Sequence, residues 1–331
     1  MSYTLGSHRS KCLDIVEVFD TVIVRFVSEE IGGLSLKTDD NPRGQYFEQE
    51  LKHMIEEIYA HVFVDIDIQH IFRTAKSAKS NSQTLLDQIK ETYVDANALG
   101  GIASRVVGFF TNTSKPSHDF MRRLYKTGKS MEQLANAVLA AIVASFEYIP
   151  ALINTVNFYL DPAHSEHRAQ LIALSGSKDS QANNIIAGYV REALRLDPLF
   201  SHARRTVVEP ATIGGSQFKR GDSLLLAIAE SNLDPEIFPN PQSVDPRRPP
   251  SSYTLMGDGL HRCFTDEFVH STMACAVRAV FQLTNIRRGP GKSGILRRFQ
   301  DSDGTTARSR YLNSKQIITP FPTTLTLQYD V

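Results

Sequence analysis

The chain has 331 residues, 41% of them hydrophobic, so it is long enough and apolar enough to bury a sizeable core. Its 36 basic and 36 acidic side chains balance, which argues against a surface adapted to nucleic acid or to an anionic membrane. Three scattered cysteines exclude a disulfide framework, and none has the spacing of a zinc site. With no signal peptide at the start, these properties favour a cytoplasmic globular protein whose partner is a small molecule or another protein.

Helices are predicted first over residues 13–27 and 46–72, the second of which carries apolar residues at helical spacing. Residues 76–83 are polar and rich in serine and lysine, which indicates a surface loop. A mixed helical region is expected from there to Tyr125.

A capping box opens the next helix, because Ser130 supplies a hydroxyl and Gln133 a side-chain amide three residues later. Residues 134–146 are apolar on nearly every face, which predicts a helix through the centre of a domain. The apolar run is shorter than the ~20 residues that cross a bilayer, so no transmembrane anchor is predicted. Pro150 should kink or end this helix, because it removes a backbone donor.

The second half of the chain has shorter elements. A helix with an apolar stripe is predicted after Ser180, its cap, and Asp197-Pro198 should stop it. The elements predicted after it are strands at 205–208 and 224–227, a meander at 234–250 with six prolines, a helix at 264–283 and a final edge strand at 323–328.

A glycine loop delivers Cys263 to the start of the helix predicted at 264–283. The helix dipole and free backbone N–H groups stabilise a thiolate in this place and suit it to metal ligation. Gly257 and Gly259 allow the backbone to lie close to a large flat group, and His261 is placed to donate to an anionic group beside the metal. For the loop taken alone, a small buried cysteine after a turn is the alternative.

A carboxylate and a guanidinium, Glu192 and Arg195, share one helix face at i,i+3 spacing. Alone, such a pair is usually a solvated surface contact. Here the pair precedes the proline-rich meander, Arg248 and the cysteine loop, in that order. The ordered set resembles the cytochrome P450 family, in which Glu192 and Arg195 match the ExxR motif and Arg248 completes a buried Glu-Arg-Arg cluster.

The resemblance extends to the cysteine loop, where Gly257, Gly259, His261 and Cys263 match the family's haem-binding signature. It implies haem b as cofactor, with Cys263 as the axial ligand to the iron. It also implies that Arg205 and His261 contact the haem propionates. The basic pair Arg297-Arg298 is interpreted as structural or solvated.

The fold implied by the resemblance is mainly α with small β-sheets, a cytochrome P450-like haem-thiolate fold that is incomplete at the N-terminus. We expect one partial domain over 1–331. It comprises a helical distal-side region at 1–125, a central helix at 130–160 and a haem-binding core at 180–331.

Segments beginning at Ser28, Asn285 and Pro320 resemble the C-terminal P450-like domain of fungal linoleate diol synthases, the psi-factor-producing oxygenases. In that family a dioxygenase domain makes a fatty-acid hydroperoxide, and the P450-like domain rearranges it to a diol without reductase or NADPH. The resemblance implies a fatty acid or its hydroperoxide as substrate and a fused or separate dioxygenase domain as partner. Contact with lipid droplets or a membrane surface stays open.

Two departures from the P450 pattern matter. Thr265 stands where a glycine usually follows the cysteine. The central helix lacks the acid-threonine pair of monooxygenases, so Ser145 and Glu147 become the candidate catalytic groups, with ordinary helix residues as the alternative. Three hypotheses follow: a hydroperoxide isomerase of oxylipin metabolism, a reductase-dependent monooxygenase, and a degenerate, non-catalytic P450-like domain.

Overall fold

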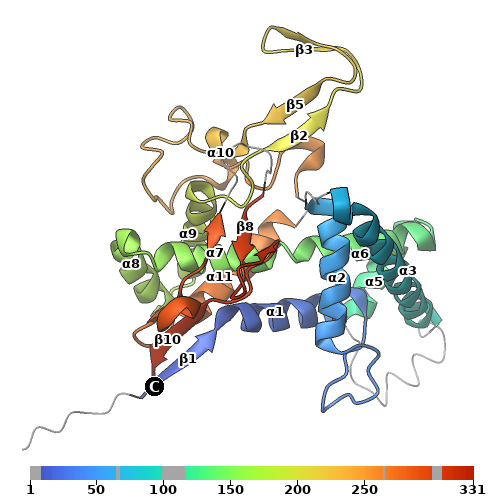
Figure 1. The fold of residues 1–331 in the computed structure, drawn as a ribbon, viewed down its shortest axis with the longest axis horizontal. Helices are drawn as coiled ribbons and strands as arrows, with labels where there is room; N and C mark the ends of the chain where they lie inside the picture. The colour runs from blue at the N-terminus through green and yellow to red at the C-terminus, as the bar shows by residue number, and fades with distance from the viewer. Residues whose placement is uncertain (1–8, 65–67, 99–115, 264, 300–307) are drawn as a thin grey trace, which may run out of the picture. The chain divides into compact units, whose positions relative to one another are not determined.

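Helices dominate the computed structural model, which describes residues 9–64, 68–98, 116–263, 265–299 and 308–331 (Figure 1). The chain divides into two units. We call Glu17–Ile149 the helical unit, and Met1–Val16 with Pro150–Val331 the C-terminal unit. The prediction of one partial P450-like domain over the 331 residues stays a prediction, and each unit is described by itself.

The helical unit is built around α6 (Met131–Ser145), which contacts α2, α3 and the π-helix η1. The capping box is confirmed: the Ser130 hydroxyl accepts from the Gln133 backbone N–H at 3.3 Å, and the Gln133 side chain accepts from the Ser130 N–H at 3.0 Å. Buried apolar residues cover much of α6, as its composition predicts. The other elements are α1 (Ile15–Arg25), which begins in the C-terminal unit, η1 (Phe26–Gly32), α2 (Glu48–Phe63), α3 (Ile68–Ala98) and α5 (Pro116–Tyr125).

The predicted loop at residues 76–83 was wrong, because this segment lies inside α3. Its polar side chains cover one side of a long helix, while Ala78, Leu85 and Ile89 are buried at helical spacing. With so few apolar positions on the buried face, the helical period is hard to detect among serines and lysines.

The predicted effect of Pro150 is confirmed. The chain leaves the helical conformation after Ser145 and resumes it in α7 (Tyr148–Tyr159), with Pro150 in the first turn, where its missing amide proton is not needed. Met131–Tyr159 is apolar and long enough to cross a membrane by length and composition alone, but 67% of its most apolar window is buried inside the protein. This burial is typical of core helices.

The C-terminal unit packs α9 (Ala182–Leu196) against α8 (Ser165–Gly176) and α11 (Asp266–Phe281). The predicted cap of α9 was wrong: the helix begins after Gln181, whose backbone N–H is accepted by the Asp179 carboxylate at 2.9 Å. Short helical segments of this unit are η2 (Pro162–His164), α10 (Ile228–Ser231), η3 (Pro250–Ser252), η4 (Gly259–His261) and η5 (Gly291–Gly294).

The predicted final strand is present, but its predicted position at the edge of a sheet was wrong. Strand β10 (Thr326–Asp330) lies in the middle of a sheet, between β1 (Ser10–Asp14) and β6 (Arg287–Arg288). Cys12 pairs with Gln328 in this sheet, so the covering strand comes from the other end of the chain. Local alternation cannot reveal a partner so distant in sequence.

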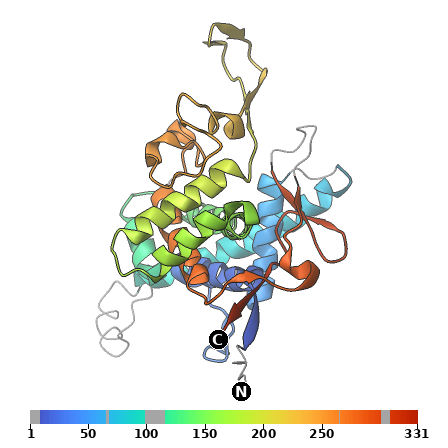
Figure 2. The ribbon, with the colours of Figure 1, turned by 90° about the vertical axis from the view of Figure 1, so that its left-hand side faces the viewer.

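An arm of two small β-ladders projects from the C-terminal unit (Figures 1 and 2). Strand β2 (Ala203–Thr206) pairs with β5 (Ser223–Leu226), and β3 (Ala211–Ile213) with β4 (Ser216–Phe218), all antiparallel. Strands β2 and β5 match the strands predicted at 205–208 and 224–227 within two residues. A third sheet joins β7 (Arg298–Phe299), β8 (Arg310–Leu312) and β9 (Ile318–Thr319).

Candidate functional site

The cysteine loop is closed by its own backbone. The Cys263 N–H donates to the Met256 carbonyl at 2.7 Å, and the Gly257 N–H donates to the Thr254 carbonyl at 3.0 Å. Gly257 and Gly259 have φ of 76° and 59°, in the left-handed region that glycine adopts without a steric penalty. The glycines therefore set the course of the loop that leads to Cys263.

One side of this loop is open. A Cβ atom added to Gly259 would meet no atom within 4 Å, and Leu260 is fully exposed. Cys263 is half-buried, with its sulfur 3.1 Å from the Thr265 hydroxyl oxygen. A thiolate sulfur can only accept hydrogen bonds. The hydroxyl of Thr265, which stands where the P450 pattern has glycine, would therefore donate to it. A soft sulfur donor beside an open glycine loop fits a large flat metal-containing group such as haem.

The two residues predicted at the propionates are placed as follows. Arg205 lies on β2, is exposed and donates to the neighbouring Arg204 carbonyl at 2.8 Å, which leaves donors free for an anion. The His261 side chain lies outside the described residues. His202, which the sequence did not single out, is buried just before β2, and its Nε2 has no hydrogen-bond partner in the described part of the chain.

The Arg195 side chain is fully buried, and every one of its N–H groups is used. Its guanidinium donates to both Glu192 carboxylate oxygens, at 2.7 and 2.8 Å. Its other donors reach three backbone carbonyls, those of Asn232, Pro241 and Ser243, at 3.1, 2.6 and 3.0 Å. A charged group fully removed from water is tolerated here because it is paired and fully hydrogen-bonded.

Glu192 is equally buried and accepts from several groups besides Arg195. The Asp245 backbone N–H donates to it at 2.8 Å, the Tyr253 hydroxyl at 2.8 Å and the Arg248 Nε at 3.4 Å. The structure thus brings together Glu192, Arg195 and Arg248. Tyr253 was missed by the sequence reasoning, and burial, followed by the Glu192 charge, raises the pKa of its hydroxyl strongly.

The meander packs directly on α9 at this cluster. A Cβ atom at Gly188 would lie 1.9 Å from the Pro246 carbonyl oxygen, so only glycine fits between the helix and the meander. The Phe238 ring covers the guanidinium groups of Arg195 and Arg248, at 5.0 and 5.8 Å from its centroid.

Hydrogen bonds connect the cluster to the start of the cysteine loop. The backbone carbonyl of Asn232 accepts from Arg195. The Asn232 side chain donates to the Thr254 hydroxyl at 2.9 Å and accepts from the Thr254 N–H at 3.2 Å. Thr254 in turn accepts from the Gly257 N–H. The cluster therefore anchors the loop that carries Cys263.

A second carboxylate with two side-chain partners, Asp266, lies at the start of α11, just after the loop. Asp266 accepts from Arg262 at 2.9 Å and lies 3.0 Å from the His270 Nε2. Burial, reinforced by Arg191, lowers the pKa of His270 to about 4, and the opposing effect of Asp266 is smaller. His270 is therefore neutral at pH 7 and donates to Asp266 through its Nε2–H.

The predicted distal groups belong to the helical unit. The Ser145 hydroxyl, at the end of α6, donates to the Ala141 carbonyl at 2.7 Å. The Glu147 carboxylate accepts from the Tyr59 hydroxyl. Because Cys263 belongs to the other unit, a shared site of Ser145, Glu147 and Cys263 stays a prediction.

A cytochrome P450 family model matches residues 177–254, which hold Glu192, Arg195 and Tyr253. Among solved structures, CYP109E1 from Bacillus megaterium in complex with corticosterone superposes with a TM-score of 0.68 at 15% identity, over 97% of this chain and 73% of that chain. P450BioI in complex with a hexadec-9Z-enoic acid ligated acyl carrier protein gives 0.64 at 17% identity, over 96% and 69%. The chain has the cytochrome P450 fold.

Curated relatives with this P450-like sequence are fungal. A bifunctional dioxygenase–epoxy alcohol synthase of Fusarium oxysporum is 28% identical, over 96% of this chain and 25% of that protein. Psi-producing oxygenase A of Emericella nidulans is 25% identical, over 96% and 30%. The 7,8-linoleate diol synthase of Pyricularia oryzae is 21% identical, over 92% and 32%. The predicted resemblance is confirmed, and the chain spans about a quarter to a third of these relatives.

Proposed function

We propose that this chain is a haem-thiolate domain of oxylipin metabolism that rearranges fatty-acid hydroperoxides to diols. The observation that carries the proposal is Cys263 at an open glycine loop, anchored by the buried Glu192–Arg195 cluster. The names of two of these relatives, a 7,8-linoleate diol synthase and a bifunctional dioxygenase–epoxy alcohol synthase, support fatty-acid substrates.

The proposed reaction is an isomerisation and needs no external electrons. The O–O bond of the hydroperoxide breaks, one oxygen stays on its carbon as a hydroxyl, and the other enters a C–H bond as a second hydroxyl. Bound haem supplies iron whose thiolate ligand donates electron density that favours O–O cleavage.

In this proposal each residue of the chain has a limited task. Cys263 would provide the sulfur ligand, and Thr265 would donate a hydrogen bond to that sulfur. Arg205 and His261 would hold the propionates. Ser145 or Glu147 would guide the peroxide.

The first test concerns the ligand. Purified protein with bound haem should show the red-shifted CO band of a thiolate haem after reduction with dithionite. Cys263→Ser should abolish this band, whereas Cys275→Ser, which alters an exposed cysteine elsewhere on α11, should leave it unchanged. Equal loss from the two variants would contradict the assignment of Cys263.

The second test concerns the reaction. A linoleic acid hydroperoxide supplied alone should yield a diol detectable by mass spectrometry, and linoleic acid with NADPH and a reductase should yield no hydroxylated product. The reverse result would favour a monooxygenase. No product in either reaction, despite bound haem, would favour a degenerate, non-catalytic P450-like domain.

A further inference from the structure

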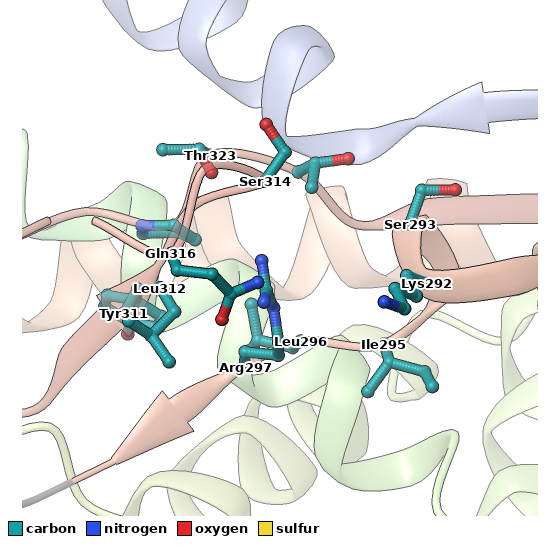
Figure 3. Close-up of a pocket in the computed structure, with 12 residues that line it drawn as sticks. Lys292, Ser293, Ile295, Leu296, Arg297, Tyr311, Leu312, Ser314, Gln316 and Thr323 are labelled. Atoms are coloured by element: carbon teal, nitrogen blue, oxygen red, sulfur yellow. The ribbon is translucent and has the colours of Figure 1, made fainter. Parts of the chain in front are cut away.

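A pocket of about 150 Å³ lies in the C-terminal unit, apart from the cysteine loop (Figure 3). The segment from Lys292 to Arg297 forms one wall, and the β8–β9 hairpin with the chain that follows it forms the other. The described residues of the lining include a lysine, an arginine, a glutamine and several hydroxyl groups, and none of them carries a carboxylate. Its charge therefore favours an anion.

Lys292 is carried by a tightly folded loop. A Cβ atom at Gly294 would lie 2.1 Å from the Gly289 carbonyl oxygen, so the chain crosses itself in backbone contact. The Arg288 guanidinium donates to the Gly294 carbonyl at 3.2 Å. Lys292 lines the pocket and forms no ion pair with another described residue, so its ammonium group is available to a ligand.

Arg297 is held from both sides. Its carbonyl accepts from the Leu312 N–H at 3.0 Å, and its guanidinium donates to the Asn313 carbonyl. One guanidinium nitrogen is thus used by the protein, which orients the group and leaves other N–H donors for a ligand. These contacts of a half-buried arginine agree with the structural one of the two interpretations, structural or solvated, that its sequence context allowed.

Gln316 is one of three non-glycine residues with positive φ in the described chain, at 63°. The Asn313 side chain holds this turn by accepting from the Lys315 and Ile317 N–H groups, both at 2.9 Å. Figure 3 shows the Gln316 amide beside the Arg297 guanidinium. A left-handed residue needs such support from its surroundings, and here the turn delivers a third donor to the pocket.

Asp14, the carboxylate bonded to the lining residue Thr324, is already satisfied by its own hydrogen bonds. Asp14 accepts from the Thr324 hydroxyl at 2.6 Å and from the Val16 and Leu325 N–H groups, both at 3.0 Å. Besides the hydroxyl groups, the pocket has an apolar part of its wall, formed by Ile295, Leu296, Leu312 and Pro322. Its volume is below the ~300–1,000 Å³ of sites that enclose a drug-sized ligand, so it holds a head group and a few carbons.

We propose that this pocket binds a carboxylate that bears an apolar chain. The carboxylate is bound by Arg297, Lys292 and Gln316, and the chain leaves over the exposed Ile295 side chain. Guanidinium groups bind carboxylates through paired hydrogen bonds, and the apolar wall disfavours a fully hydrated inorganic ion. The proposal does not depend on the haem-thiolate reaction, because no pocket residue belongs to the cysteine loop or the Glu192 cluster.

The test is calorimetric titration of the full chain with octanoate. Lys292→Met and Gln316→Leu should each weaken binding about tenfold or more, since each removes a donor and keeps a stem of similar length. Lys315→Met is the matched control: this exposed lysine is in the same turn as Gln316 but outside the pocket lining, and its loss should change the affinity less than twofold. All three positions are exposed, so folding should be unaffected, as circular dichroism would verify.

Two further probes separate the sources of affinity. Octanol should bind at least tenfold more weakly than octanoate, and inorganic phosphate should not compete with octanoate. Four results would overturn the proposal: no saturable octanoate binding, equal affinity for octanol, equal weakening by Lys315→Met, or phosphate binding with the same dependence on Lys292.

Discussion

Two acid–arginine pairs in this protein have the same spacing and opposite surroundings. Glu192–Arg195 in α9 and Asp119–Arg122 in α5 both place the acid three residues before the arginine. The α9 side chains are 0% exposed, whereas those of Asp119 and Arg122 are 43% and 48% exposed. The pairs are similar in sequence and differ in everything that follows from burial.

Burial changes what each pair contributes. An exposed pair is screened by water and contributes ~0.2–1 kcal/mol. A buried pair leaves an uncompensated charge when one partner is removed, which costs ~3–5 kcal/mol. The hydrogen bonds from Arg195 fix the backbone of the meander and of the residue Asn232 against α9. The α5 pair is exposed to solvent.

The largest effect should come from removing the acid of each pair. Glu192→Ala should lower the free energy of unfolding by ~3–5 kcal/mol, because Arg195 is left charged and buried. Asp119→Ala should lower it by less than ~1 kcal/mol. Urea unfolding followed by circular dichroism would measure both, and similar small losses would show that burial does not separate the two pairs.

Disturbing the packing around the buried pair should have the next largest effect. Gly188→Ala places a methyl group 1.9 Å from the Pro246 carbonyl, so the meander must shift away from α9. Overpacking of this kind costs ~1–3 kcal/mol, and a backbone neighbour places it at the upper end. Gly176→Ala, at the end of α8 with no atom within 4 Å, is the control and should be neutral within ~0.5 kcal/mol in the same urea assay. Equal losses of stability in the two variants would show that the meander is not in close contact with Gly188.

A third pair, Asp266 and His270, tests whether burial also controls charge. The folded-state pKa of His270, about 4, lies below the ordinary histidine value of 6.5, so the unfolded chain binds a proton more readily. Stability should be complete above pH 6.5 and fall as the pH drops from 6.5 toward 4, by on the order of 3 kcal/mol at ~1.4 kcal/mol per pKa unit. His270→Gln should flatten this part of the stability–pH curve. If the His270→Gln variant lost as much stability between pH 6.5 and 4 as the unmodified protein, the lowered pKa of His270 would be contradicted.

The smallest of these effects should come from a single hydroxyl. Tyr253→Phe removes one donor to Glu192 and leaves the remaining donors in place, so we expect a loss of ~1.5–2 kcal/mol in the free energy of unfolding. Tyr329→Phe on β10, whose hydroxyl has no hydrogen bond within the described residues, should change it by less than ~0.5 kcal/mol. A larger loss from Tyr329→Phe would show that aromatic hydroxyls stabilise this protein for other reasons.

Features that depend on neighbouring residues were predictable from the sequence. The capping box at Ser130 and the helix end near Pro150 follow from rules that act within one turn of the chain. The P450 fold was predicted from ordered motifs, because Glu192, Arg195 and Arg248 keep a characteristic order along the chain.

Features that depend on distant partners were decided only by the tertiary structure. Strand β10 is central because β1, from the opposite end of the chain, pairs with it. Tyr253 joins the Glu192 cluster because the meander folds back over α9, where Gly188 allows close contact. The same i,i+3 spacing gives a buried centre in α9 and a solvated pair in α5, since spacing sets which residues face each other and tertiary packing sets whether water reaches them.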